Sequence, residues 1–180
     1  MPRNKREQDR EEKRDSIIAA ARQLFLDAGY DACSMSKLAA QAGIAPNTIY
    51  WYFKDKDDVL VAVLNKELSG RMAEYLQITF NNTTERLLWV VSQLQLASRL
   101  VSTVHARVQL SPAIDSWHDQ FHALSEGILR LEMQAAGVTS DRIDALLKIC
   151  VFTIEGLLSH PMSDEQQKNI CQALTASYMA

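Results

Sequence analysis

Apolar residues recur at the spacing of an α-helix along almost the whole chain, and no convincing stretch alternates apolar and polar residues as a half-buried strand does. Glycine and proline, with 6 and 4 residues, are too scarce for the many tight turns of an all-β fold. The sequence therefore predicts an all-α protein with about nine helices. We expect these helices over residues 16–28, 34–42, 46–53, 55–79, 84–100, 102–110, 112–136, 141–159 and 164–179.

Composition and charge exclude several other classes of protein. Of the 180 residues, 47% are hydrophobic and 23% are charged, which rules out disorder as the main state. The cysteines Cys33, Cys150 and Cys171 are too few and too scattered for a disulfide framework or a zinc ribbon. No apolar run is long enough to span a bilayer, and the start of the chain is too charged for a signal peptide. We therefore expect a cytoplasmic protein, and the net charge of −3 does not by itself indicate nucleic acid.

Residues 34–56, with the sequence SMSKLAAQAGIAPNTIYWYFKDK, are the most informative stretch. Ser34 is a good N-cap for the helix that follows it, and Gly43 suits a left-handed turn residue at the end of that helix. The next helix opens on a proline and is too short to be stable alone in water. We expect packing through Ile49 and Phe53 to hold it in place.

The same stretch leaves polar and aromatic side chains for a partner. Three exposed aromatic rings on one short helix are costly unless something covers them, and two lysines follow directly. Amides, hydroxyls, rings and lysines on a presented helix are what reading the major groove of DNA requires. The alternative is that the rings pack against the following helix and the lysines are only solvated. The residues that we expect to be exposed are Asn47, Thr48, Tyr50, Trp51 and Tyr52, followed by Lys54 and Lys56.

These motifs resemble those of the tetracycline-repressor (TetR) family of bacterial regulators. The resemblance covers residues 17–60, where Ala-Ala…Leu-Phe, Gly-Tyr, the Leu-Ala…Ala-Gly-Ile turn, Tyr-x-x-Phe and Lys-x-Asp-x-Leu fall in register. It implies a three-helix helix-turn-helix DNA-binding domain over residues 1–55, which includes a tail over 1–15, and a helical effector-binding and dimerisation domain over 56–180. It also implies a ligand-responsive repressor that binds a near-palindromic operator as a homodimer and is released by a small molecule, while activation stays open.

The resemblance also assigns individual residues to DNA. It places Ser34, Tyr50 and Lys56 on phosphates and makes Asn47 the best base-reading candidate, because its amide can form two hydrogen bonds to a base. Ala45 departs from the family pattern, which often has a capping serine or threonine there. The full predicted set is Ser34, Ser36, Pro46, Asn47, Thr48, Tyr50, Trp51, Tyr52 and Lys56.

A mixed-charge run over residues 3–15 precedes the first helix. Opposite charges three or four residues apart would allow it to extend that helix. We favour a frayed, solvated tail instead, which also weakens the alternative of a minor-groove arm formed by Arg3, Lys5 and Arg6.

The helix over residues 141–159 is apolar on all sides, with only Lys148 and Glu155 charged within its apolar run. It needs cover on both sides, either from a second subunit or from the helices over 84–100 and 112–136 of the same chain. The resemblance favours a dimer formed by the last two helices. The predicted interface residues are Leu146, Ile149, Thr153, Leu157, Ile170, Leu174 and Tyr178.

The effector site is the least defined part of the prediction. For most of its aromatic and polar candidates, plain core packing is the favoured alternative. The candidates are Met72, Tyr75, Trp89, Arg99, His105, Trp117, Phe121 and Phe152.

A stripe of histidines and acids invites a metal site, since two of its histidines have i, i+4 spacing. The inward face of this helix is expected to be apolar, so the stripe is expected to be solvated, and we predict no metal and no cofactor. The stripe consists of Asp115, His118, Asp119, His122 and Glu126, and the expected inward face of Ile114, Trp117, Phe121, Leu124, Ile128 and Leu131.

Two other functions stay open at this stage. A small helical hydrolase or metalloprotein would need a nucleophile and base, or a ligand cluster, in a cleft, and analysis of bound metal would detect the latter. A DNA-bound protein of the same fold without a role in transcription would occupy many genomic sites without affecting the genes nearby.

Overall fold

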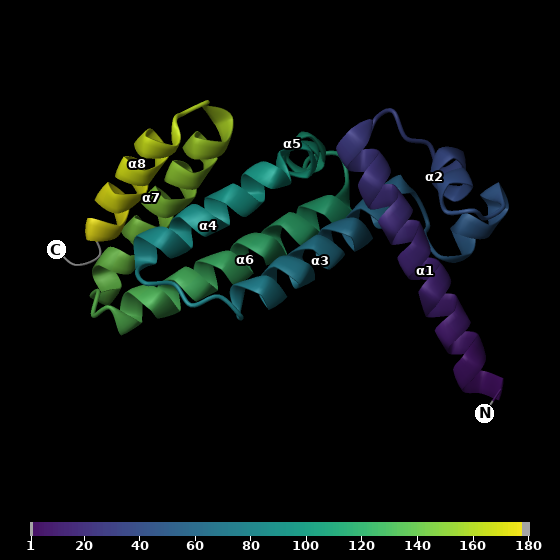
Figure 1. The fold of residues 1–180 in the computed structure, drawn as a ribbon, viewed down its shortest axis with the longest axis horizontal. Helices are drawn as coiled ribbons and strands as arrows, with labels where there is room; N and C mark the ends of the chain where they lie inside the picture. Colours follow the sequence, from purple (N-terminus) through teal and green to yellow (C-terminus); the bar gives the residue numbers. More distant parts are fainter. Residues whose placement is uncertain (1, 178–180) are drawn as a thin grey trace. The chain divides into compact units, whose positions relative to one another are not determined.

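The computed structural model describes residues 2–177, with side chains from residue 7 onward. This part of the chain is all-helical, as the sequence predicts, and contains eight α-helices and one 3₁₀ helix (Figure 1). The helices are α1 (Pro2–Asp27), α2 (Met35–Gln41), η1 (Pro46–Trp51), α3 (Lys56–Tyr75), α4 (Thr83–Leu96), α5 (Ser98–Arg107), α6 (Pro112–Ala135), α7 (Ser140–Ser159) and α8 (Asp164–Ala176).

The helices form two compact units. The first unit comprises residues 1–76 and 99–117, so α5 and the first turn of α6 join α1, α2, η1 and α3. Its buried core includes residues from each of these helices, among them Phe25, Leu38, Ile49, Leu60 and Val104. The division at residue 55 that the sequence suggested remains a prediction about function, because packing groups α3 and α5 with the helices before them.

The second unit comprises residues 77–98 and 118–180. Helices α4, α7 and α8 pack on one another, and the rest of α6 adds Met133 to their core. Most of the buried residues come from α7, including Ile143, Leu147 and Cys150. Side chains of α4 and α8 also meet through the hydroxyls of Thr84 and Thr175, which lie 2.7 Å apart.

Two expectations about these helices are wrong. The backbone of residues 2–15 is helical and continuous with the rest of α1, so the mixed-charge run extends the helix. The side chains of Arg3, Lys5 and Arg6 lie outside the described residues. The helix expected over 84–100 ends at Leu96, which is exposed, and only Leu87 and Val91 of α4 are buried.

Among the described residues, no single helix is long and apolar enough to cross a membrane. Helices α4 and α5 meet that requirement by length and composition only when they are taken together, and the chain is broken between them.

Candidate nucleic-acid interface

Helix α2 and the turn after it have the capping groups that the sequence predicts. The Oγ atom of Ser34 accepts a hydrogen bond of 3.2 Å from the backbone N–H of Lys37. At the other end, Gly43 has a φ of +69°, and its N–H and that of Ile44 donate to the carbonyls of Ala40 and Ala39. This pair of bonds is a Schellman motif, which satisfies carbonyls at the end of α2 and turns the chain sharply into η1.

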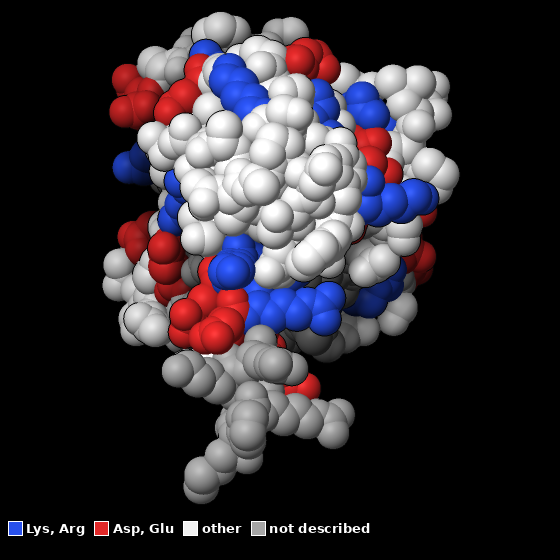
Figure 2. Space-filling model, turned by 90° about the vertical axis from the view of Figure 1, so that its right-hand side faces the viewer, with Lys and Arg blue, Asp and Glu red and all other residues white. Residues whose placement is uncertain are grey.

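The 3₁₀ helix η1 is anchored by two buried side chains. Ile49 and the Phe53 that follows η1 are almost completely buried in the core of the first unit. Their burial leaves Tyr50 56% exposed and Trp51 78% exposed on the opposite side. Figure 2 shows this face as an uncharged area with Lys and Arg side chains at several points of its edge and Asp and Glu side chains among them. The alternative that all the aromatic rings are buried is therefore wrong for Tyr50 and Trp51.

The remaining predicted residues of this surface are less uniform. Ser34, Ser36, Pro46 and Asn47 are exposed, and Thr48 is half-buried. No side chain caps η1 at Ala45, as the departure from the family pattern implied.

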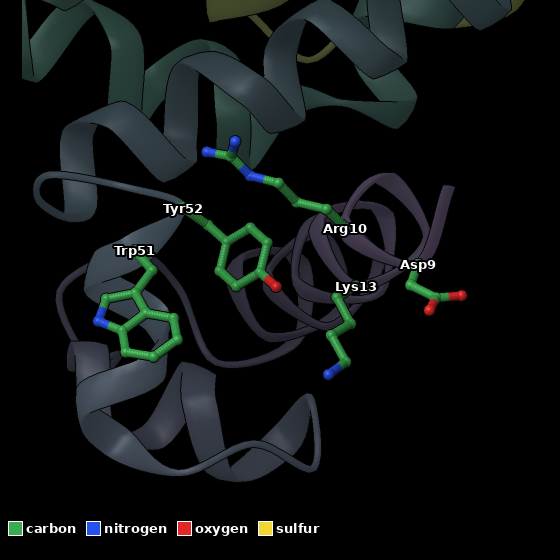
Figure 3. A pocket seen from close by; sticks show the side chains of 5 residues that line it. All are labelled: Asp9, Arg10, Lys13, Trp51 and Tyr52. Atoms are coloured by element: carbon green, nitrogen blue, oxygen red, sulfur yellow. The ribbon is translucent and has the colours of Figure 1, made fainter. Parts of the chain in front are cut away.

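Tyr52 corrects the prediction of three exposed rings, since it is half-buried and packs against the core of the first unit. With Trp51 it lines a pocket whose other wall is the exposed part of α1 (Figure 3).

Lys56 has a different environment from the one that the resemblance implied. Its Nζ atom donates a hydrogen bond of 2.9 Å to the carbonyl of Tyr30 and lies 3.9 Å from the centroid of the Tyr30 ring. The side chain is half-buried and ties the start of α3 to the loop between α1 and α2. Two of its three N–H groups remain for a phosphate, so a role in DNA binding stays a prediction.

A charged cluster that the sequence did not predict includes Tyr30, in the loop between α1 and α2. Arg107 of α5 donates two hydrogen bonds, of 2.6 and 2.7 Å, to the carboxylate of Asp57, and the Tyr30 hydroxyl donates a third of 2.5 Å. The guanidinium carbon of Arg107 also lies 4.8 Å from the centroid of the Tyr30 ring. The cluster therefore links α5, the start of α3 and the loop that leads into α2.

The protonation states of this cluster follow from its hydrogen bonds. The Arg107 guanidinium holds the pKa of Asp57 below its ordinary value, although burial acts in the opposite direction. Burial, and next the bond to Asp57, raise the pKa of Tyr30 well above its ordinary value. At neutral pH the cluster is thus a carboxylate, a guanidinium and a neutral phenol.

Arg99 makes a second link between α5 and the start of the chain. Its guanidinium donates hydrogen bonds of 2.9 and 2.6 Å to the carbonyls of Leu26 and Asp27, at the end of α1. Those carbonyls have no partner within the helix, so Arg99 caps α1 from a distant part of the chain. Arg99 was predicted as an effector residue, and this contact gives it a structural role.

The predicted effector residues are divided between the two units, and none of them is tested as a ligand contact. His105 is exposed, and the Trp117 indole donates to the side chain of Asn65 in the first unit. Trp89 packs edge-on against Phe80 in the second unit. The first unit holds Met72, Tyr75, Arg99, His105 and Trp117, and the second holds Trp89, Phe121 and Phe152.

The faces of α6 differ from the expectation. His118 and His122 are half-buried, and their Nε2 atoms lie 3.1 Å apart, whereas we expected a fully solvated stripe. Conversely, Leu124 and Leu131 are exposed, although both were placed on the inward face. Within the described part of the chain, no three His, Cys, Asp or Glu residues are grouped so that they would hold a metal ion.

Helix α7 has two different apolar faces. Leu146 and Leu157, and Leu174 of α8, lie in the buried core of the second unit, so their apolar character is explained by packing within the chain. Ile149 is 49% exposed and Phe152 is 67% exposed, so the helices of the chain do not cover α7 completely. Thr153 and Ile170 are half-buried, and Tyr178 lies outside the described residues.

Sequence similarity to known proteins is higher at the start of the chain than over longer stretches of it. Residues 17–63 match the family described as bacterial regulatory proteins, tetR family. A fatty acid metabolism regulator protein from Bacillus subtilis (strain 168) is 43% identical over 61 residues, which are 34% of this chain and 31% of that protein. The HTH-type transcriptional activator FasR of Mycolicibacterium smegmatis is 26% identical over 140 residues, 78% of this chain and 54% of that protein.

This chain thus spans about a third and about half of the length of these two curated relatives. A solved structure of a transcriptional regulator from Rhodococcus sp. Rha1 superposes with a TM-score of 0.76 at 14% identity, covering 92% of this chain and 95% of that one. At this identity the likeness shows the fold alone.

Proposed function

Since residues 17–63 make this chain a member of the tetR family of bacterial regulatory proteins, we propose that it is a transcription regulator that reads an operator with η1. The observation that carries the proposal is the exposure of Tyr50 and Trp51 on a helix whose other side is locked into the core by Ile49 and Phe53. Exposed rings with neighbouring amides and hydroxyls match the edges of bases, and the lysines around them match phosphates.

The proposed active form is a homodimer. Ile149 and Phe152 lie three residues apart on the exposed face of α7, which gives a second copy an apolar strip to cover. A two-fold dimer would set two copies of η1 about one DNA turn apart and make the operator a near-palindrome. On this proposal Phe152 belongs to the subunit interface, and the effector set reduces to the other seven predicted residues.

Control by a small molecule would act through α5. The Arg107–Asp57 pair joins α5 to the first turn of α3, so a shift of α5 would move the loop that leads into α2. A ligand changes DNA affinity only if it binds the two arrangements unequally. We propose that the effector favours the arrangement with low DNA affinity, so that the protein is a repressor that its effector releases from DNA. We also propose that it works in the cytoplasm and is not an enzyme. Activation, the role named for one relative, would require instead that the DNA-bound protein raises transcription of the neighbouring gene.

Selection of bound fragments from genomic DNA by the purified protein tests the proposal. We expect enrichment of a near-palindromic sequence upstream of a small number of genes. Asn47→Ala should relax base preference at one position of each half-site, whereas Tyr50→Phe should weaken binding to all sequences alike. Enrichment of no sequence, or an unchanged preference in Asn47→Ala, would contradict the assignment of η1. Many dispersed sites without effect on nearby transcription would instead favour a role outside transcription.

A further inference from the structure

Helix α1 extends beyond the core of the first unit. Every side chain in residues 7–16 is exposed, and the buried part of α1 begins at Ile17. A short exposed helix of this kind is not stable alone in water, so it forms here as the continuation of the anchored half of α1. The extension therefore holds its side chains in defined positions beside η1.

The charges of this extension are segregated. Arg10, Lys13 and Arg14 follow the i, i+3, i+4 spacing of one helix face, and that face continues into the buried residue Ile17. The guanidinium carbon of Arg14 lies 5.2 Å from the centroid of the Phe53 ring, so this face is turned toward the end of η1. Most acidic residues of the extension lie on the other faces of the helix.

A pocket of about 410 Å³ lies between this basic face and η1, and its lining is Asp9, Arg10, Lys13, Trp51 and Tyr52. Figure 3 shows the Tyr52 ring between the Arg10 and Lys13 side chains, with its hydroxyl pointing toward α1. The carboxylate of Asp9 points away from both aromatic rings. Among residues 7–177, no hydrogen bond or ion pair occupies the Arg10 guanidinium, the Lys13 ammonium or the Tyr52 hydroxyl.

We propose that this pocket binds a phosphodiester of the DNA backbone next to the groove that η1 enters. The inference rests on the proposed DNA binding and adds a contact outside the helix-turn-helix. A guanidinium, an ammonium and a phenol are the donors that phosphate oxygens accept from, and two cations with one carboxylate leave a single positive charge for the single negative charge of a phosphodiester. Because such a contact carries no base information, it would set the register of each subunit on the duplex.

Binding to a duplex of arbitrary sequence tests this site without knowledge of the operator, because phosphate contacts supply most non-specific affinity. The variant is Arg10→Gln with Lys13→Gln, and binding is followed by fluorescence anisotropy over a series of salt concentrations. We expect affinity at low salt to fall about tenfold. The plot of log affinity against log salt should become less steep by about 1 per subunit.

A matched control removes two charges away from the extension, with Arg71→Gln on α3 and Lys168→Gln on α8. Its salt slope should equal that of the wild type. Tyr52→Phe keeps the ring and removes only the hydroxyl, so it should weaken binding by a smaller factor and leave the slope unchanged. All of these side chains are exposed or half-buried, and circular dichroism would show that the helices remain.

Equal slopes for the wild type and the Arg10/Lys13 variant, with measurable DNA binding by both, would overturn the phosphate site and leave the proposed function standing. Equal losses in the Arg71/Lys168 control would attribute the effect to net charge and would also overturn the site. Failure of the wild-type protein to bind any duplex would overturn the site and the proposed function together.

Discussion

The two compact units of this chain expose apolar surface in different ways. In the first unit two large exposed rings, Tyr50 and Trp51, lie side by side on one short helix that the core holds rigidly, and two exposed leucines, Leu76 and Leu110, lie apart from them just after α3 and α5. In the second unit the exposed apolar side chains are aliphatic or phenyl groups spread over α4, α6 and α7, such as Leu96, Leu131 and Phe152. On the proposed function, the rings of the first unit would meet DNA, whereas the exposed side chains of the second unit would serve an effector and a second subunit on different helices. The family match over residues 17–63 lies wholly within the first unit.

The largest expected effect tests whether the exposed apolar face of α7 is a subunit interface. Ile149→Glu with Phe152→Glu would bring the new carboxylates of one subunit close to those of the other across a two-fold axis. Because these like charges repel, we expect a monomer by analytical ultracentrifugation. Operator affinity should fall about 100-fold, because one half-site makes too few contacts alone.

Leu131→Glu is the matched control, since Leu131 and Phe152 are both 67% exposed. It should leave the oligomeric state unchanged. Loss of the dimer in this control, with a dimer retained in the α7 variant, would move the interface to α6.

A smaller effect should distinguish the polar links of the first unit from ordinary surface ion pairs. Asp57→Asn leaves the partly buried Arg107 without its carboxylate, and we expect it to lower the free energy of unfolding by about 2 kcal/mol at neutral pH. Glu74→Gln breaks the exposed pair with Arg71 and should cost less than about 0.5 kcal/mol. Urea denaturation of both variants measures the contrast.

The pH dependence gives the same prediction a second readout. The pKa of Asp57 is lowered in the folded protein, so its carboxylate stabilises the fold above about pH 4 and this contribution is lost as the pH falls further. The difference in stability between the wild type and Asp57→Asn should therefore shrink on acidification. A difference that is constant from neutral to acidic pH would show that the substitution acts through something other than this charge.

The smallest expected effect concerns the uncapped start of η1. Ala45→Ser would supply a side-chain acceptor where none exists and should raise stability by about 0.5 kcal/mol. Ala40→Ser, at an exposed position within α2, should lower stability slightly because serine is a poorer helix former than alanine. Equal changes in the two variants would mean that η1 gains nothing from a cap.

What the sequence predicts well is local. Ser34 and Gly43 act on backbone groups within a few residues of themselves, so their types and spacing are sufficient to place the ends of α2. The core residues Ile49 and Phe53 follow from the same short-range logic, because a helix of one or two turns can bury only one side.

Contacts between distant residues are what the sequence does not predict. Arg107 and Asp57 are 50 residues apart, and helical periodicity gives each of them a face but no partner. The faces of α6 fail for another reason, since apolar residues occur on several sides of this helix and Leu131 satisfies the same spacing as the buried positions. The straight extension of α1 was missed because its charge pattern suits both a helix and a solvated tail.

The cap that Arg99 places on α1 has a consequence for protein engineering. The first unit is discontinuous in the sequence, because the segment from Arg99 to Trp117 is folded into it and Arg99 caps the free carbonyls at the end of α1. A chimaera that grafts only residues 1–55 onto a foreign sensor would lose that cap along with the Arg107–Asp57 pair. Functional grafts should instead carry residues 1–76 together with the 99–117 corner.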